Sequence, residues 1–228
     1  YFPMERLNLL NNQFSNQDTA ALMHVAQAPA DPILSLSTGF KADTNTNKVN
    51  LGVGAYRTEE GKPLVFPVVR AAEAKICADH SLDKEYLPID GNQDFNRGAR
   101  GVLFGWEHAD VTSGRVASSQ TLSGTGALRV VGEFLAKHKS SPIYVSDPTW
   151  GNHNTVFAKC GLDVRKYRYF NKKTKGLDFE GMIADLKAAA PGSTILLHTC
   201  AHNPTGVDPT LDQWKQIAAV VKERALYP

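Results

Sequence analysis

The sequence predicts an α/β fold built on a mostly parallel sheet. Short apolar runs at 143–145, 164–170 and 194–197 have the length and composition of buried strands, and amphipathic helical segments separate them. Strands that alternate with helices of this length are typical of a parallel sheet covered by helices. Polar and glycine-rich segments follow the strands directly, which is where such sheets place their ligands.

The segment that precedes the sheet contains two predicted helices. Residues 31–64 are irregular, and the glycines near the centre of this stretch indicate a close approach of the backbone to another group. Helical periodicity begins at 67 and continues to 80, and a second helix is expected over 92–104. The apolar face of the first helix consists of Val68, Val69, Ala72 and Ile76.

Four further helices are expected in the region of the strands, three of them with clear start signals. One opens at Ser123, one begins after Asp178 as its N-cap, and one begins at Thr210, which forms a capping-box pair with Gln213. Another helix is expected between the first two strands. The predicted core faces are Val131, Phe134 and Leu135 in the first; Phe179, Met182, Ile183 and Leu186 in the second; and Leu211, Trp214, Ile217 and Val221 in the third.

The composition argues against several functional classes. The chain has 228 residues, 42% of them hydrophobic and 21% charged, with a formal net charge of +2, which is ordinary for a globular protein. No apolar run approaches the ~20 residues of a membrane span. No dense block of Lys and Arg indicates a nucleic-acid partner, and the basic residues at 165–169 alternate as in a strand at a solvated sheet edge.

The cysteine pattern predicts neither a disulfide framework nor a metal site. Cys77, Cys160 and Cys200 are scattered and odd in number, without a C-x-x-C pair. This usage fits a reducing compartment. Cys200 lies inside a polar motif, where we expect a small buried apolar residue rather than a nucleophile.

That motif, residues 198–208, is the most informative stretch of the chain. It follows a buried strand and precedes a capped helix, so its polar groups lie at the carboxyl end of a strand. Asn203 precedes a proline, which keeps its backbone out of the α region and makes its amide a well-fixed donor. The bare tetrapeptide Asn-Pro-Thr-Gly is equally compatible with an ordinary turn that ends at Gly206.

Two other loops add a phosphate site and a flat surface. Ser123, Gly124 and Thr125 open a helix, whose free N–H groups and dipole suit a phosphate, although a plain helix start is about as frequent. Trp150 follows a strand and offers a face for a planar ring, or packs in the core. His153 and His198 fit supporting groups beside that ring, or ordinary core histidines.

A phosphate, a flat ring and a hydrogen-bonded ring oxygen together describe pyridoxal phosphate. From about residue 28 onward, the chain resembles the amino-terminal half of a class I aspartate aminotransferase. The motifs that carry this resemblance occur in the family's order: V-N-L-G-V-G-A-Y-R at 49–57, K-E-Y-L-P-I-D-G at 84–91, Q-T-L-S-G-T-G-A-L-R at 120–129, D-P-T-W-G-N-H at 147–153 and H-T-C-A-H-N-P-T-G at 198–206.

The resemblance implies a role for each cofactor-binding residue. Gly124 and Thr125 would hold the phosphate, with Ser123 adjacent. Trp150 would stack on the pyridine ring and contact substrate. Asn203 would donate a hydrogen bond to the phenolic oxygen of the ring and also line the substrate site.

Other implied roles concern the surroundings of the ring. Tyr86 would reach the phosphate of the neighbouring subunit, because family active sites form at a homodimer interface. Gly54 would line the pocket for the substrate carboxylate. His153 and His198 would support the carboxylate that keeps the pyridine nitrogen protonated. The family also carries cis prolines at the positions of Pro148 and Pro204.

The resemblance further implies fold type I of the pyridoxal-phosphate-dependent transferases, incomplete in this chain. Residues 1–27 would be a flexible extension, 28–64 an arm and small-domain segment, and 65–228 the first part of the cofactor-binding large domain. The Schiff-base lysine would lie beyond Pro228, so no residue here is assigned as the catalytic base. We therefore expect part of a longer enzyme, with an open sheet edge and exposed apolar helix faces.

The expected activity is transfer of the amino group between L-aspartate and 2-oxoglutarate. The alternatives are an aromatic-amino-acid aminotransferase and an inactive fragment that only binds a ligand or partner. A nucleotide-binding Rossmann domain is disfavoured, since G-x-G-x-x-G is absent. Residues 1–22 lack a secretory signal and are poor in Arg, which favours the cytoplasm over the mitochondrial matrix.

Overall fold

The computed structural model describes residues 24–29, 34–50, 52 and 54–228. The chain divides into two compact units, Tyr1–Lys84 and Glu85–Pro228. Throughout the described ranges, no helix combines the length and the apolar character needed to cross a membrane.

Within its described residues, the amino-terminal unit contains two helices. Helix α2 (Leu34–Ala42) lies in the stretch expected to be irregular, so that expectation is wrong for these nine residues. Helix α3 (Pro67–Ala78) confirms the predicted helix and starts with a proline at its first position, where no N–H is needed. It ends two residues earlier than predicted, because the N–H of Asp79 turns back to the carbonyl of Ile76. Neither helix has a buried residue.

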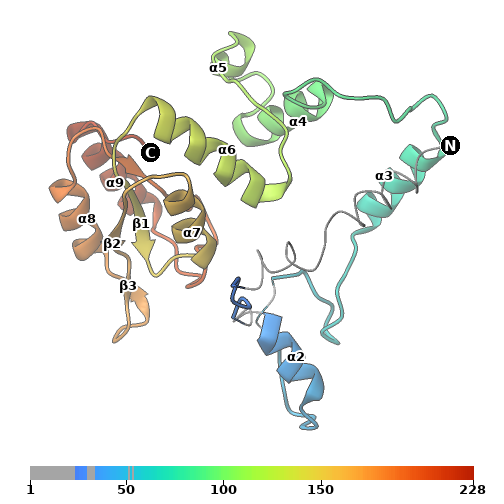
Figure 1. The fold of residues 1–228 in the computed structure, drawn as a ribbon, viewed down its shortest axis with the longest axis horizontal. Helices are drawn as coiled ribbons and strands as arrows, with labels where there is room; N and C mark the ends of the chain where they lie inside the picture. The colour runs from blue at the N-terminus through green and yellow to red at the C-terminus, as the bar shows by residue number, and fades with distance from the viewer. Residues whose placement is uncertain (1–23, 30–33, 51, 53) are drawn as a thin grey trace. The chain divides into compact units, whose positions relative to one another are not determined.

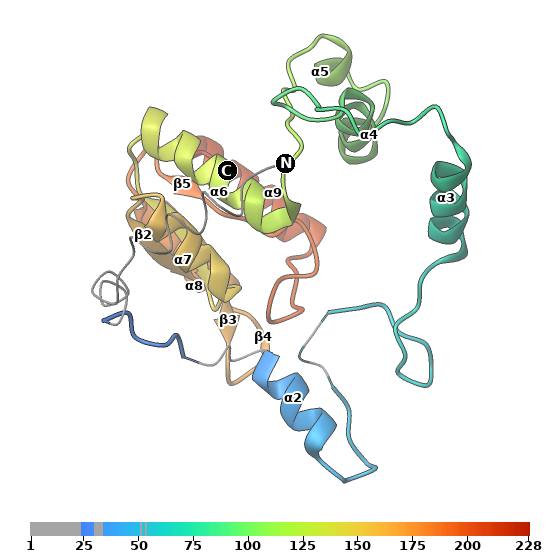
Figure 2. The same ribbon diagram turned by 45° about the vertical axis from the view of Figure 1, so that its right-hand side comes forward.

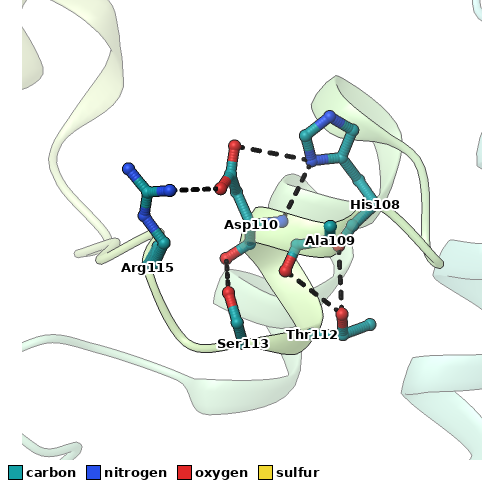
Figure 3. A network of polar contacts seen from close by, with 6 residues as sticks. All are labelled: His108, Ala109, Asp110, Thr112, Ser113 and Arg115. Atoms are coloured by element: carbon teal, nitrogen blue, oxygen red, sulfur yellow. Dashed lines mark hydrogen bonds and ion pairs between the residues drawn. The ribbon is translucent and has the colours of Figure 1, made fainter.

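The second unit begins with helices α4 (Gln93–Phe104) and α5 (Ala109–Thr112). The predicted second helix is confirmed, since the Asn92 side chain accepts a hydrogen bond from the N–H of Phe95 and caps α4. Figure 3 shows how α5 is held: Nδ1 of His108 accepts from the N–H of Asp110 at 3.3 Å, and Arg115 pairs with the Asp110 carboxylate at 3.2 Å. This helix had no signal in the hydrophobic pattern, because its single turn depends on local caps.

The main sheet has three parallel strands in the order β2-β1-β5. They are β1 (Ile143–Asp147), β2 (Val164–Arg168) and β5 (Thr194–Ile195). Ile143 pairs with Val164 on one side and with Thr194 on the other, which confirms the predicted parallel arrangement. Four helices surround this sheet in both views of the fold (Figures 1 and 2): α6 (Ser123–His138), α7 (Gly151–Lys159), α8 (Phe179–Ala188) and α9 (Leu211–Glu223).

Two apolar clusters place these helices on opposite faces of the sheet. On one face, Leu135 of α6 and Phe157 of α7 pack against Ile143 and Val145. On the other face, side chains of α8 and α9 pack against β2 and β5. The buried members of this second cluster include Tyr167, Tyr169, Met182, Leu186, Ile195, Ile217 and Val220.

The predicted strand over 164–170 is interrupted at Tyr169. The carbonyl of Tyr169 accepts the N–H of Asp178, and the chain then enters a two-stranded antiparallel hairpin, β3 (Phe170–Asn171) with β4 (Gly176–Leu177). Both predicted caps are confirmed. The Asp178 side chain accepts from the N–H of Gly181, and Thr210 and Gln213 form a complete capping box at the start of α9.

Three residues expected in the core are exposed. Leu135 of α6 is buried, but Val131 and Phe134 are 51% and 60% exposed, because Gly132 and not Val131 faces the neighbouring helix α7. Leu211 is also exposed, since it occupies the first position of α9 beside the cap. Ile217 and Val220 supply the buried face of that helix instead.

Candidate functional site

The site lies where the direction of the sheet's connections changes. From β1 the chain passes to α7 on one face, whereas from β5 it passes to α9 on the opposite face. The loops that leave these neighbouring strands therefore diverge, and such a divergence leaves a crevice at the carboxyl ends of the strands. Trp150 and His153 follow β1, and His198 and Asn203 follow β5, so the structure brings these four predicted residues to one edge.

A threonine and two histidines join the two loops. The Thr149 hydroxyl lies 2.7 Å from Nδ1 of His153 and 3.4 Å from Nε2 of His198. The two imidazoles meet edge to face, with ring centroids 5.2 Å apart. The ring of Trp150 meets His153 edge to face as well, at 5.4 Å. Thr149 was not singled out from the sequence, but it links the residues that were.

His202 is a second buried histidine, and it packs beneath the loop that follows β5. The sequence indicates no role for it. Nε2 of His202 lies 2.8 Å from the hydroxyl of Ser146 in β1, and Nδ1 lies 2.7 Å from the hydroxyl of Thr205. Its ring also stacks on Tyr169. The available signal was the spacing of four residues from His198, whose ring centroid lies 4.3 Å from that of His202.

The environment favours the uncharged form of all three histidines. Burial, helped by the nearby His198, lowers the pKa of His153 to about 4. Burial, together with His198 and against the opposing charge of Asp208, lowers the pKa of His202 to about 4 as well. For His198, burial lowers the pKa while the charge of Asp208 opposes the shift. At neutral pH these rings are therefore hydrogen-bonding groups without charge.

The Asn203 turn is held by its backbone. The N–H of Asn203 donates to Nδ1 of His198 at 3.1 Å, and the N–H of Gly206 donates to the carbonyl of His202 at 2.7 Å. The peptide bonds before Pro148 and Pro204 are both cis, as the resemblance implies. The Asn203 side chain itself is exposed, so its amide faces away from the packed interior.

The first turn of α6 supplies exposed hydrogen-bond donors. Ser123, Gly124 and Thr125 are exposed, and Leu122 at the N-cap provides no side-chain cap. A Cβ added to Gly124 would meet open space. The second turn of α6 lies beside the β5 loop, because both line one cavity of about 440 Å³. Its lining includes Ala127, Leu128, Leu197, Thr199 and Trp214.

These groups match the needs of pyridoxal phosphate. An uncapped helix start offers N–H groups and a positive dipole end to a phosphate. The partly buried indole of Trp150 offers a flat apolar face, and the exposed amide of Asn203 offers a donor for a ring oxygen. The residues present therefore fit this cofactor by the chemistry of their donors.

Two predicted site residues belong to neither strand loop nor to the start of α6, and one expectation about a cysteine is wrong. Tyr86 precedes α4 and is 97% exposed. Gly54 belongs to the amino-terminal unit and is exposed. Cys200 was expected to be buried, but it is exposed, because it lies on the loop after β5 beyond the end of the packed strand. Cys160 is the buried cysteine.

Comparison with known proteins gives consistent similarities. The family described as aminotransferase class I and II matches residues 46–228. A cytoplasmic aspartate aminotransferase from Oryza sativa subsp. japonica is 55% identical over 205 residues, which cover 90% of this chain and 50% of that protein. A chloroplastic aspartate aminotransferase 3 from Arabidopsis thaliana is 52% identical over 206 residues, covering 90% of this chain and 46% of that protein.

A solved structure shows the same similarity in three dimensions. The aromatic-amino-acid aminotransferase from Burkholderia pseudomallei, covalently bound to pyridoxal phosphate, superposes with a TM-score of 0.81 at 42% identity. The match covers 90% of this chain and 51% of that one. The chain thus spans about half the length of the relatives it matches.

Proposed function

The chain belongs to the aminotransferase class I and II family, and we propose that it forms part of an aspartate aminotransferase. The expected fold type I is confirmed by the family match and the structural neighbours. The proposed reaction transfers the amino group between L-aspartate and 2-oxoglutarate. Pyridoxal phosphate would supply the electron sink for this chemistry when bound.

The residues of this chain would bind and orient that cofactor. The first turn of α6, with Ser123, Gly124 and Thr125, would hold the phosphate through its N–H and hydroxyl groups. Trp150 would pack on the ring and contact substrate. The Asn203 amide would donate to the phenolic oxygen and line the substrate site.

One observation carries this proposal most strongly. At the crevice between the β1 and β5 loops, Trp150 and Asn203 are backed by His153 and His198, which burial keeps uncharged. His198 accepts the Asn203 N–H at Nδ1, so its own N–H lies at Nε2 and donates to the Thr149 hydroxyl, which in turn donates to Nδ1 of His153. The remaining N–H of His153, at Nε2, can donate to a neighbouring carboxylate without neutralising its charge. A carboxylate must keep its negative charge if it is to hold a pyridine nitrogen in the protonated form, and a neutral hydrogen-bond donor leaves that charge in place.

Tyr86 and Gly54 are proposed to act in subunit assembly and in substrate binding. The fully accessible Tyr86 side chain would reach the phosphate site of a second subunit in a homodimer. Gly54, at which an added Cβ meets no atom within 4 Å, would line the pocket for the substrate carboxylate. We also propose a cytoplasmic location, as in the rice relative; the Arabidopsis relative shows that plastid isozymes exist as well.

An aromatic-amino-acid aminotransferase is the second candidate, because the matched Burkholderia structure carries that name. The curated relatives named as aspartate aminotransferases are more similar in sequence, at 52% and 55% identity, which favours aspartate. Steady-state kinetics of the intact protein with L-aspartate and L-phenylalanine separate the two. We expect the larger kcat/KM with aspartate.

The test of the proposed function is a visible spectrum of the intact protein with added pyridoxal phosphate, before and after borohydride reduction. We expect a pH-sensitive band that reduction fixes to the protein, seen as a mass increase in the intact protein. Trp150→Leu should perturb the band, whereas Trp106→Leu, at an exposed tryptophan near α5, is the control. No band and no mass increase would refute the proposal.

A further inference from the structure

The Asn203 side chain depends on its main chain for its position. Among the described residues, no hydrogen bond to another protein group holds its amide, and the side chain is exposed. Its orientation is therefore set by the backbone around it. The N–H of Asn203 itself is fixed by Nδ1 of His198.

The two residues before Asn203 are held by a single carboxylate. The N–H of Ala201 donates to Oδ2 of Asp208 at 2.7 Å, and the N–H of His202 donates to Oδ1 at 2.9 Å. Each carboxylate oxygen therefore receives one backbone donor, and hydrogen bonds to an ionised acceptor are stronger than neutral ones. These two N–H groups lower the pKa of Asp208, so the carboxylate is ionised at neutral pH.

The clamped segment has an unfavourable backbone conformation. Ala201 has a φ of +50°, in the left-handed region that is unfavourable for a residue with a Cβ. A conformation of this kind persists only when surrounding contacts hold it. The carboxylate of Asp208 contacts the N–H of that residue directly.

The other end of the loop is anchored independently. The Tyr169 hydroxyl donates to the carbonyl of Val207 at 2.7 Å, next to Asp208 in sequence. The N–H of Val207 donates to the Thr205 hydroxyl at 3.2 Å. The backbone next to Asp208 is therefore anchored by Tyr169, and the Asp208 carboxylate holds Ala201 and His202 in place relative to that anchor.

We propose that Asp208 is a positioning residue for Asn203, acting through the backbone of Ala201 and His202. Asp208 touches neither the substrate nor the cofactor in this scheme. Its link to cofactor recognition rests on the proposed function, but the clamp itself is a property of the protein alone. Because Asp208 is exposed, its replacement removes two hydrogen bonds without opening a cavity in the core.

The clamp is tested first without cofactor. Amide hydrogen exchange of the intact apoprotein is compared for wild type and Asp208→Ala by NMR. We expect exchange at Ala201 and His202 to accelerate by about tenfold or more, with the core amides of α8 unchanged. Asp163→Ala is the matched control, since that exposed carboxylate binds the Arg165 side chain instead of backbone groups.

The positioning role is tested with cofactor in a double-mutant cycle. The readout is the pKa of the visible band in Asp208→Ala, Asn203→Ala and the double variant. We expect Asp208→Ala to shift this pKa in the same direction as Asn203→Ala and to add nothing when Asn203 is already alanine. A merely structural role would leave the Asp208 effect undiminished in the double variant.

The outcomes separate the two proposals. Unchanged amide exchange at Ala201 and His202 would overturn the clamp, whether or not pyridoxal phosphate binds. An additive spectral effect would overturn the positioning role. If the wild type gives no band, the proposed function fails, and the exchange data still decide the clamp. Asp208→Asn, which keeps one acceptor oxygen, should give a smaller effect in the same direction and serves as the second variant if alanine impairs folding.

Discussion

The imidazole of His202 stacks on the phenol ring of Tyr169, with ring centroids 3.8 Å apart and planes 13° from parallel. This contact joins the β5 loop to the end of β2. Tyr169 also donates its hydroxyl to the carbonyl of Val207, and burial raises its pKa to about 12, so it remains a donor. Ring and hydroxyl therefore hold the same loop in two different ways.

Tyr169→Phe separates these contributions. The ring stack is retained, and the Val207 carbonyl loses its donor, so we expect the free energy of unfolding to fall by about 1 kcal/mol. Tyr169→Leu removes the buried ring as well and should cost about 3 kcal/mol. Urea unfolding of the intact protein measures both. Equal losses in the two variants would show that the ring stack contributes nothing.

The histidines predict a pH dependence of stability. The pKa values of His153 and His202 are about 4 in the folded protein, against 6.5 for a free histidine. Between pH 6.5 and 4 the unfolded chain therefore binds more protons, and the free energy of unfolding falls as the pH is lowered through that window. Urea midpoints across this range check the sign.

A matched pair of variants identifies the source of this dependence. His202→Gln should flatten the slope between pH 6.5 and 4, because one buried imidazole no longer titrates on unfolding. His80→Gln, at an exposed position, is the control and should keep the wild-type slope. A wild-type slope in His202→Gln would contradict the assignment.

Gly132 predicts an unusual response to alanine. In a helix interior, Gly→Ala is normally stabilising by up to about 1 kcal/mol. A Cβ at Gly132 would lie 2.6 Å from Sγ of Cys160 and 3.3 Å from Cδ1 of Phe157, where α6 meets α7. We therefore expect Gly132→Ala to destabilise the protein by about 1–3 kcal/mol in thermal or urea unfolding.

The control for Gly132 is another helical glycine. A Cβ at Gly98 in α4 would meet nothing within 4 Å, so Gly98→Ala should leave stability unchanged or raise it. Adding Cys160→Ala to Gly132→Ala should recover part of the loss by removing the clashing sulfur. Destabilisation of equal size at both glycines would argue against the close helix contact.

Asn203→Ala tests the hydrogen bond to the cofactor. The phenolic oxygen would lose its donor, and we expect the pKa of the visible band to rise, because the form with a negative oxygen is less stabilised. A spectral pH titration of the intact protein measures this change. Gln216→Ala, at an exposed amide on α9, is the control. An unmoved pKa in Asn203→Ala would refute the role.

Local signals predicted the helices and strands of the parallel sheet, but not α2, α5 or the β3–β4 hairpin. The caps at Asp178 and Thr210 depend on hydrogen bonds within three residues, so the sequence is sufficient to locate them. The parallel sheet follows from the alternation of strands and helices. The break after β2 could not be predicted, because it depends on the carbonyl of Tyr169 turning to the N–H of Asp178, nine residues away.

The candidate site was predictable in its residues but not in its connections. Trp150, His198 and Asn203 lie on loops after strands, as the sequence indicates, whereas His153, expected on a loop, lies in the first turn of α7. The pairing of Ser146 with His202 spans 56 residues and depends on β1 and β5 being neighbours. The exposure of Val131 likewise depends on which face of α6 meets α7, and periodicity alone does not distinguish between adjacent faces.

The candidate site lies beyond the strand ends and outside both apolar clusters. The residues proposed for recognition are therefore largely separate from those that stabilise the fold. Trp150 and Asn203, which we propose for recognition, belong to neither cluster, so their substitution should leave the layers beneath intact. His153 and His202 are the exceptions, because both imidazoles are buried, and His202 also bonds the Thr205 hydroxyl within the turn that carries Asn203. Replacement should therefore be tolerated best at the exposed loop tips and least at these two buried imidazoles.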